Sequence, residues 1–341
     1  MKKNINILIA ILLLLTACSG GSKELRLVSF RGEVFGTYYS VSYYSADGRN
    51  YQAAMDSLFR DINQSLSYYV PNSLLSRINR NETNLADGYF LAVLERSLEV
   101  AEQTSGAFDP TVSPLVNAWG FGFDNALSMT PEVIDSLKRI TGYERVRIEQ
   151  NRIIKDIPEI QFDFNAIAKG YAADLAGQLL EARGIETYLV ELGGDLIARG
   201  LKPDGTPWRI GIEKPAKDML APQDWAFLVE MHNRALATSG STRKYYMKDG
   251  QRLSHTIDPS TGRPVQHNLL SVSVFANTCM MADAFATAFM VMGLEKSVEF
   301  VENRDDLDAF FIYSEAEDKL NTYTTPGLKV LTREEVESDN L

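Results

Sequence analysis

The stretch from Ala235 to Pro264 reads ALATSGSTRKYYMKDGQRLSHTIDPSTGRP. Its apolar start before Thr-Ser-Gly predicts a strand that enters a tight turn. Asp249-Gly250 predicts a two-residue hairpin loop, because these residue types adopt the positive φ angles that such a loop needs. His255 and Asp258 follow near the end of the second strand, so hydroxyls, cations, an imidazole and a carboxylate gather around one hairpin. On these residues alone, a polar surface hairpin explains the pattern as well as a functional site does.

A second polar pair lies on a strongly apolar segment, where residues 278–293 predict a helix that is buried on most sides. Asp283 and Thr287 are four residues apart and therefore share one face of this helix. A buried carboxylate is costly unless it is paired or bound to a cation. A carboxylate with a hydroxyl and no histidine suits Mg²⁺ better than zinc. Pairing of Asp283 with an Arg or Lys from another element is the structural alternative.

A third cluster runs from Asp163 to Gly170, at a predicted strand-to-helix junction. Asn165 is a suitable N-cap for a helix from Ala166 to about Arg183. The exposed N–H groups of such a start attract an anion, and Lys169 adds positive charge one turn later. The Gly-x4-Gly-Lys spacing of nucleoside-triphosphate enzymes is missing. A capped helix with a solvated lysine remains the other interpretation.

The chain as a whole has 341 residues, of which 45% are hydrophobic and 23% are charged, enough for a sizeable core. Strands and helices neither alternate strictly nor segregate, which predicts an α+β fold with mixed or largely antiparallel sheets flanked by helices. Near the N-terminus, residues 25–30 and 34–44 predict two strands that are separated by Arg31-Gly32. The acidic tail of residues 332–341 predicts disorder.

The N-terminus predicts a targeting segment, with basic Lys2-Lys3 before an apolar run that is too short to span a membrane. Leu15-Thr16-Ala17-Cys18 resembles the bacterial lipoprotein cleavage box. That resemblance implies a signal peptide over residues 1–17, a lipidated (palmitate-bearing) Cys18 and a flexible tether over residues 18–24. We therefore expect a membrane-anchored lipoprotein that faces the periplasm, on either membrane; a plain signal peptide with an incidental cysteine is the alternative.

The net charge of −11 gives the chain no electrostatic reason to bind nucleic acid. Its two cysteines are Cys18 and Cys279. With Cys18 lipidated, neither an intramolecular disulfide nor a thiolate zinc site is possible. A domain of residues 25–331 must then rest on its hydrophobic core.

The motifs from Val34 to Gly293, in their order along the chain, resemble the ApbE-like flavin transferases, FAD:protein FMN transferases. The resemblance rests on Phe35-Gly36-Thr37, Ser67 to Pro71, Gly106 to Thr111, Asp163 to Gly170, Glu191 to Asp195, Trp208 to Ile212, Ala237 to Gly240, His255 to Pro259, and Ala282 to Thr287. Each motif is weak singly, but nine in family order are specific. The resemblance implies an ApbE-like α+β fold with a flavin site at the junction of two subdomains.

The resemblance also implies the roles of individual residues. Asp283, Thr287 and the backbone carbonyl of Ala166 would hold Mg²⁺, and His255 would assist proton transfer from the acceptor hydroxyl. The FAD-binding residues that it implies are Phe35, Tyr69, Ala107, Phe108, Asp109, Asp163, Lys169 and Ile257. Phe35 stands where the family usually has Met, and Phe164-Asn165-Ala166 stands where many members have Leu-Gly-Gly. Both departures affect the shape of the pocket more than its chemistry.

The implied reaction is the transfer of FMN from FAD to a threonine or serine hydroxyl of a target protein, with release of AMP. It needs a cation at the phosphate oxygens, an in-line nucleophile and a base, and an imidazole is a suitable base at neutral pH. The expected acceptors are subunits of membrane redox complexes. Two alternatives use the same site: an FAD pyrophosphatase, in which water replaces the acceptor, and an FAD-binding lipoprotein without turnover. His232 and His267 have no motif around them and are expected to be structural or surface residues.

Overall fold

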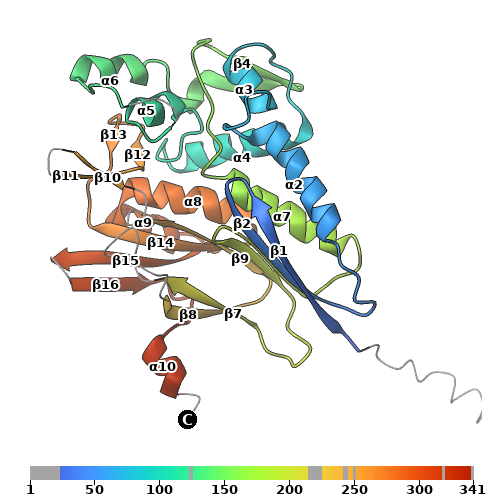
Figure 1. The fold of residues 1–341 in the computed structure, drawn as a ribbon. Helices are drawn as coiled ribbons and strands as arrows, with labels where there is room; N and C mark the ends of the chain where they lie inside the picture. Colours follow the sequence, from blue (N-terminus) through green and yellow to red (C-terminus); the bar gives the residue numbers. More distant parts are fainter. Residues whose placement is uncertain are drawn as a thin grey trace, which may run out of the picture.

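The computed structural model describes residues 24–122, 126–213, 225–240, 245–248, 251–316 and 319–338 (Figure 1). Its centre is an eight-stranded sheet with the order β1-β2-β5-β6-β9-β14-β15-β16, beside a three-stranded sheet, β17-β8-β7, and three hairpins. All strand pairs in these ranges are antiparallel. The predicted α+β class is confirmed, and the sheets are antiparallel where parallel pairs were also allowed.

The large sheet consists of β1 (Arg26–Val34), β2 (Thr37–Ser45), β5 (Tyr188–Leu192), β6 (Asp195–Arg199), β9 (Arg234–Gly240), β14 (Leu269–Ala276), β15 (Asp308–Ala316) and β16 (Lys319–Thr324). The smaller sheet consists of β7 (Trp208–Glu213), β8 (Trp225–Met231) and β17 (Val330–Thr332). The hairpins are β3 (Val146–Glu149) with β4 (Arg152–Lys155), β10 (Tyr245–Lys248) with β11 (Gln251–Ser254), and β12 (Ile257–Asp258) with β13 (Arg263–Pro264).

The helices are α2 (Gln52–Leu66), α3 (Leu74–Asn79), α4 (Gly88–Gln103), α5 (Ser113–Ala118), α6 (Pro131–Lys138), the short 3-10 helix η2 (Tyr143–Arg145), α7 (Ala168–Glu181), α8 (Cys279–Met292), α9 (Leu294–Glu302) and α10 (Arg333–Ser338). Helices α7 and α8 lie against one face of the large sheet, and β7 and β8 lie beyond its other face (Figure 1). The main core fills the helical side, and a second cluster around Trp208, Met231 and Phe310 fills the other.

The hairpin at Lys248 is confirmed in its strands, since Lys248 pairs with Gln251 across β10 and β11. The two connecting residues, Asp249 and Gly250, lie outside the described residues.

The first turn of the chain was predicted wrongly. β1 continues through Gly32, which pairs with Tyr39, and the reversal falls at Phe35-Gly36 instead of Arg31-Gly32. A side chain at position 32 would collide with the Tyr39 ring. Gly32 is therefore a glycine of close approach within a strand, whereas Phe35 and Gly36 adopt the positive φ angles of a tight turn, 50° and 74°.

The helix after Asp163 also begins later than predicted. α7 starts at Ala168 with Ile167 at the N-cap position, so the expected cap at Asn165 is wrong. The backbone N–H of Asn165 instead donates to Asp163 Oδ1 at 2.7 Å. This local hydrogen bond stabilises a turn before the helix. Aspartate side chains often accept from a nearby backbone N–H in this way, in competition with helix formation.

The acidic tail is partly structured, contrary to our expectation of disorder. Val330–Thr332 pairs with β8, and α10 follows at once. The Arg333 guanidinium lies over the Trp225 ring at 4.4 Å from its centroid. The boundary predicted between residues 331 and 332 therefore divides an element of the fold. Among the described residues, no helix is long and apolar enough to cross a membrane. The predicted signal peptide and Cys18 lie outside those residues.

Candidate functional site

Helix α8 carries the carboxylate that anchors the site. Thr278 caps its start by accepting from the Met281 N–H at 3.4 Å, and Gly293 ends it with a φ of 78°. The helix packs between β9, β14 and α7, so most of its surface is buried. Asp283 is only 4% exposed, and Thr287 lies one turn further along the same face.

Helices α7 and α8 are joined by reciprocal hydrogen bonds at their crossing. The Gly170 N–H of α7 donates to Asp283 Oδ2 of α8 at 3.1 Å. In return, Asp174 of α7 accepts from the Cys279 and Met280 N–H groups of α8 at 2.7 and 2.9 Å. A side chain at position 170 would collide with the Cys279 carbonyl, so only glycine permits this approach.

Lys169, next to that crossing, does not project into solvent as a free cation. Its Nζ forms an ion pair with Asp195 Oδ2, and the Asp195 side chain is only 3% exposed. Burial opposes the charge on Lys169, but the nearby carboxylates of Asp195 and Asp283 outweigh it and raise the lysine pKa. The solvated lysine considered from sequence is therefore wrong. Both polar clusters predicted from sequence, at Lys169 and Asp283, meet at one point.

The electrostatic environment of Asp283 disfavours its negative charge. Burial is the main cause, and the neighbouring Asp195 carboxylate adds repulsion, so that the pKa of Asp283 is raised to about 7. Lys169 and the Gly170 N–H offset only part of this. A cation at Asp283 would relieve the same repulsion.

Two residues of this site were missed by the sequence analysis. Asp195 follows Gly193-Gly194, a motif that we used for the resemblance without assigning a role to its carboxylate. Ser239 lies on β9, and its Oγ is 3.4 Å from Thr287 Oγ1. The Thr238-Ser239-Gly240 motif gave a signal for Ser239, but its partner became visible only when β9 and α8 were packed together.

The donor set fits a hard divalent cation. Asp283 offers a buried carboxylate, Thr287 lies one helical turn away on the same face, and Ser239 Oγ is 3.4 Å from the Thr287 hydroxyl. Ala166 lies in the turn just before α7, close in sequence to Lys169. No cluster of three or more His, Cys, Asp or Glu suited to a metal occurs in the described part of the chain. Oxygen ligands that include hydroxyl and carbonyl groups suit Mg²⁺, which keeps part of its water shell.

The turn that carries Phe35 lies next to the turn that precedes Asp195. The Gly193 N–H donates to the Tyr38 carbonyl at 2.9 Å, and a side chain at position 193 would collide with Thr37, so the β1–β2 turn and the turn before β6 are neighbours. A hollow of about 590 Å³ opens at residues 33–38. The Phe35 ring packs edge-on against Phe59, which holds this turn in place.

Tyr69, Asp163 and the loop of residues 107–110 form a second group. The Asp163 N–H donates to the Pro110 carbonyl at 2.8 Å, and Tyr69 is 58% exposed. Partial burial and the Asp163 carboxylate raise the pKa of Tyr69. Burial also raises the pKa of Asp163, although Asn165 donates to it. Half-buried Ala107 and buried Phe108 lie in the adjoining loop.

Asp109 has a structural role in this loop. Its Oδ1 accepts from the N–H and the hydroxyl of Thr111 at 2.7 and 2.6 Å, and its Oδ2 accepts from the Tyr143 N–H at 3.2 Å. Burial raises its pKa to about 6 despite these donors. The side chain thus shapes the loop, and its predicted contact with the dinucleotide stays a prediction.

His255 and Ile257 belong to a separate small cluster. Ile257 is buried with Leu115, Trp119 and Ile134 of the α5–α6 region. Trp119 Nε1 donates to the Gly262 carbonyl at 2.8 Å and ties this segment to α5. His255 is half-buried, and its ring lies 6.4 Å from the Phe121 ring. His267 is structural, as expected, with Nε2 at 2.8 Å from the Met290 carbonyl, and His232 is exposed.

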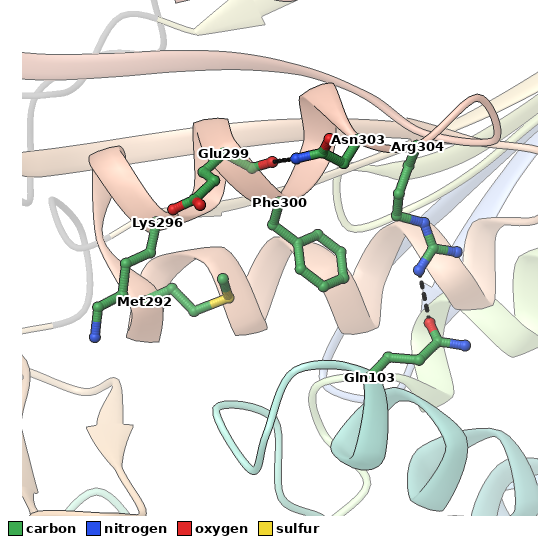
Figure 2. A pocket seen from close by; sticks show the side chains of 7 residues that line it. All are labelled: Gln103, Met292, Lys296, Glu299, Phe300, Asn303 and Arg304. Carbon is green, nitrogen blue, oxygen red and sulfur yellow. Dashed lines mark hydrogen bonds between the residues drawn. The ribbon is translucent and has the colours of Figure 1, made fainter.

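Another hollow, of about 500 Å³, lies between α4 and α9 and contains none of the predicted site residues (Figure 2). Arg304 reaches across it to Gln103 Oε1 at 2.8 Å and also pairs with Asp306. The Arg304 guanidinium lies over the Phe300 ring as well, 5.5 Å from its centroid. Its charge is thus satisfied within the protein, and the hollow lacks the convergent polar groups of the α7–α8 crossing.

The antiparallel α+β scaffold buries two carboxylates, Asp195 and Asp283, next to the partly exposed Lys169. Such a site defines a class of protein that can hold a cation and an anion together. Comparison with known proteins specifies the class further. Residues 35–311 match the ApbE family. The FAD:protein FMN transferase of Vibrio cholerae is 39% identical over 309 residues, which cover 88% of this chain and 91% of the relative. That of Escherichia coli K12 is 37% identical over 315 residues and covers 87% of each chain.

Solved structures agree with these sequence matches. The flavin transferase ApbE from Vibrio cholerae superposes with a TM-score of 0.78 at 36% identity, covering 89% of this chain and 98% of the other. The apo flavinyl transferase ApbE of Pseudomonas stutzeri gives a TM-score of 0.79 at 33% identity, covering 89% and 95%. The chain belongs to the ApbE family, and the resemblance drawn from its motifs is confirmed.

Proposed function

We propose that this protein is an Mg²⁺-dependent enzyme that transfers FMN from FAD to a threonine or serine hydroxyl of an acceptor protein. Family membership and the names of its relatives support the transfer from FAD to a protein. The observation that carries the proposal is the meeting of Lys169 and Asp283 at the α7–α8 crossing. One site therefore contains an ammonium group and a buried carboxylate that can bind a cation, as recognition of a diphosphate requires.

In this proposal Asp283, Thr287 and the Ala166 carbonyl hold the divalent cation. When bound, the cation would neutralise charge on phosphate oxygens and orient the diphosphate. Lys169 contributes a fixed positive charge. Phe35, Ile257 and Tyr69 provide apolar and aromatic surface for the dinucleotide, whereas Asp109 acts by shaping its loop.

The reaction is a displacement at the FMN-side phosphorus. The acceptor hydroxyl oxygen forms a new P–O bond, the bond to the bridging oxygen breaks, and AMP leaves with that bonding pair. The hydroxyl proton passes to a base, and His255 is our candidate. Its imidazole lies at the edge of the small cluster of Leu115, Trp119, Ile134 and Ile257, which we call the satellite cluster. The segment that carries it runs between two hairpins, where an acceptor can approach.

The cellular setting is also part of the proposal. The lipoprotein-like sequence before Cys18 supports a tether to the membrane, with the catalytic domain on the periplasmic side and acceptors among membrane redox proteins. The acidic charge of the chain supports attachment through acyl chains instead of attraction to anionic lipid.

The deciding experiment incubates the protein with FAD, Mg²⁺ and an acceptor domain that carries a single candidate threonine. Flavin fluorescence that stays on the acceptor band in a denaturing gel, together with equimolar AMP, is the expected result. An acceptor with valine at that position is the matched control and should remain dark. Free FMN with AMP and no labelled band would identify a hydrolase, and intact FAD after long incubation would identify a binding protein.

A further inference from the structure

Lys169, Asp195 and Asp283 form the charged cluster at the α7–α8 crossing, and Asp195 is the one that has no role in the proposed reaction. It is the first residue of β6, directly after the Gly193-Gly194 turn, and β6 pairs with β5 and β9 inside the large sheet. Its side chain is 3% exposed, so its carboxylate is almost fully shielded from water. The carboxylate accepts from the Lys169 ammonium, the positively charged side chain that we assign to the diphosphate beside the divalent cation.

The charges of the cluster do not balance without a further cation. Asp195 and Asp283 are both almost fully buried and both act on Lys169, so two carboxylates share one ammonium group. Charges in such surroundings interact strongly because water screens them poorly. Lys169 is therefore neutralised by Asp195, so that negative charge on Asp283 is in excess and repels a diphosphate.

A divalent cation would reverse this balance. With a cation at Asp283, the cluster of Lys169, Asp195 and Asp283 gains two positive charges and becomes attractive to a diphosphate. Without Asp195, Lys169 would already offer its charge to the diphosphate. The carboxylate of Asp195 thus determines whether tight binding of the diphosphate requires a bound divalent cation.

We propose that Asp195 couples the two ligands: it makes tight binding of the FAD diphosphate depend on prior or simultaneous binding of the divalent cation. This inference rests on the proposed function, because it takes the α7–α8 crossing as the diphosphate site. Asp195 acts through Lys169 and is a positioning residue. By linkage, the same coupling strengthens binding of the cation when FAD is present.

The test is a titration of FAD into the full-length protein, followed by quenching of flavin fluorescence, in EDTA and in saturating Mg²⁺. AMP is measured in parallel so that only intact FAD is counted. For the wild type we expect FAD to bind much more tightly with Mg²⁺. For Asp195→Asn we expect the ratio of the two dissociation constants to fall about tenfold, chiefly because binding in EDTA becomes tighter.

Two controls separate this coupling from general damage. Asp174→Asn removes another buried carboxylate from the same pair of helices, but its bonds go to the Cys279 and Met280 N–H groups, so the wild-type ratio should persist. In a Lys169→Gln background, Asp195→Asn should no longer tighten metal-free binding, because its effect passes through Lys169. Thermal melts establish that each variant is folded.

An Asp195→Asn protein that is folded but keeps the wild-type ratio would overturn the inference and leave the proposed function intact. Loss of FAD binding in both conditions would overturn it too, and would make Asp195 a direct support of the pocket. Tighter metal-free binding that persists in the Lys169→Gln background would contradict the route through Lys169. If wild-type protein failed to bind FAD even with Mg²⁺, the proposed function would fail together with the inference.

Discussion

The α7–α8 crossing and the satellite cluster at α5–α6 are built in different ways. At the crossing, charged side chains are locked between two helices and a sheet by reciprocal hydrogen bonds from Gly170, Cys279 and Met280. In the satellite cluster, Ile257 packs on three other buried apolar residues, His255 lies near the Phe121 ring, and one tryptophan hydrogen bond ties the segment to α5. The first region is built to hold charge at a fixed place, and the second leaves a polar edge where a large partner can approach.

The largest expected effect comes from breaking the rigid region. Asp283→Ala should lower metal-dependent transfer at least about a thousandfold, because the cation loses its buried carboxylate. The fold should survive, since the carboxylate that is removed is one that burial disfavours. Rates at several Mg²⁺ concentrations, with a thermal melt of the same sample, measure both outcomes. Unchanged activity with unchanged metal dependence would refute the metal assignment.

The next effect belongs to the satellite region. His255→Ala should slow turnover by about 10² to 10⁴ while FAD still binds, because the imidazole acts on the proton of the acceptor and not on the dinucleotide. Single-turnover rates and FAD titrations separate the two quantities. If FAD binding were lost instead, His255 would be a binding residue and the contrast between the two regions would weaken.

A smaller effect concerns the pH dependence of stability at the crossing. Burial outweighs the two N–H donors and raises the pKa of Asp174 from 3.8 to about 6. Between these values the folded protein binds more protons than the unfolded chain, so the contribution of this group to the free energy of unfolding is present at acid pH and is lost as the pH rises through about 6.

The loss should amount to on the order of 3 kcal/mol, at 1.36 kcal/mol per pKa unit. Asp174→Asn should remove this part of the pH dependence. About 2 kcal/mol of it falls between pH 4.5 and 7, where urea unfolding of both proteins measures it. Parallel pH profiles for the two proteins would show that Asp174 is no more disfavoured than an exposed carboxylate.

The smallest effect sharpens the comparison. Trp119→Phe removes the hydrogen bond to the Gly262 carbonyl and should cost about 1 kcal/mol. Because that bond ties the His255 segment to α5, transfer should slow several-fold while Mg²⁺-dependent FAD binding is retained. An equal loss of metal affinity would mean that the two regions are not independent.

Sequence reasoning identified the pieces of the site better than their connections. The i, i+4 spacing of Asp283 and Thr287 follows from helix periodicity, and both residues lie on α8 as predicted. The helix beside Lys169 is also present, but the strand predicted before it is not: residues 156–167, all described, contain no strand. The N-cap at Asn165 was wrong because Asp163 captures the Asn165 N–H in a local turn. The reversal at Arg31-Gly32 was wrong because a glycine signals a close approach as readily as a turn, and only the Tyr39 ring decides between them.

The sequence by itself determined the features that depend on local patterns. These are the α+β class, the apolar helix around Asp283, the paired strands on either side of Asp249-Gly250, and the ordered motifs of the family. The tertiary structure alone decided that Asp195 pairs with Lys169 and that Gly170 lets two helices touch. It also decided that the Asp109 carboxylate accepts hydrogen bonds from Thr111 and Tyr143. The physical reason is that charge pairing and close contact depend on distances between residues far apart in the chain. No local pattern encodes those distances.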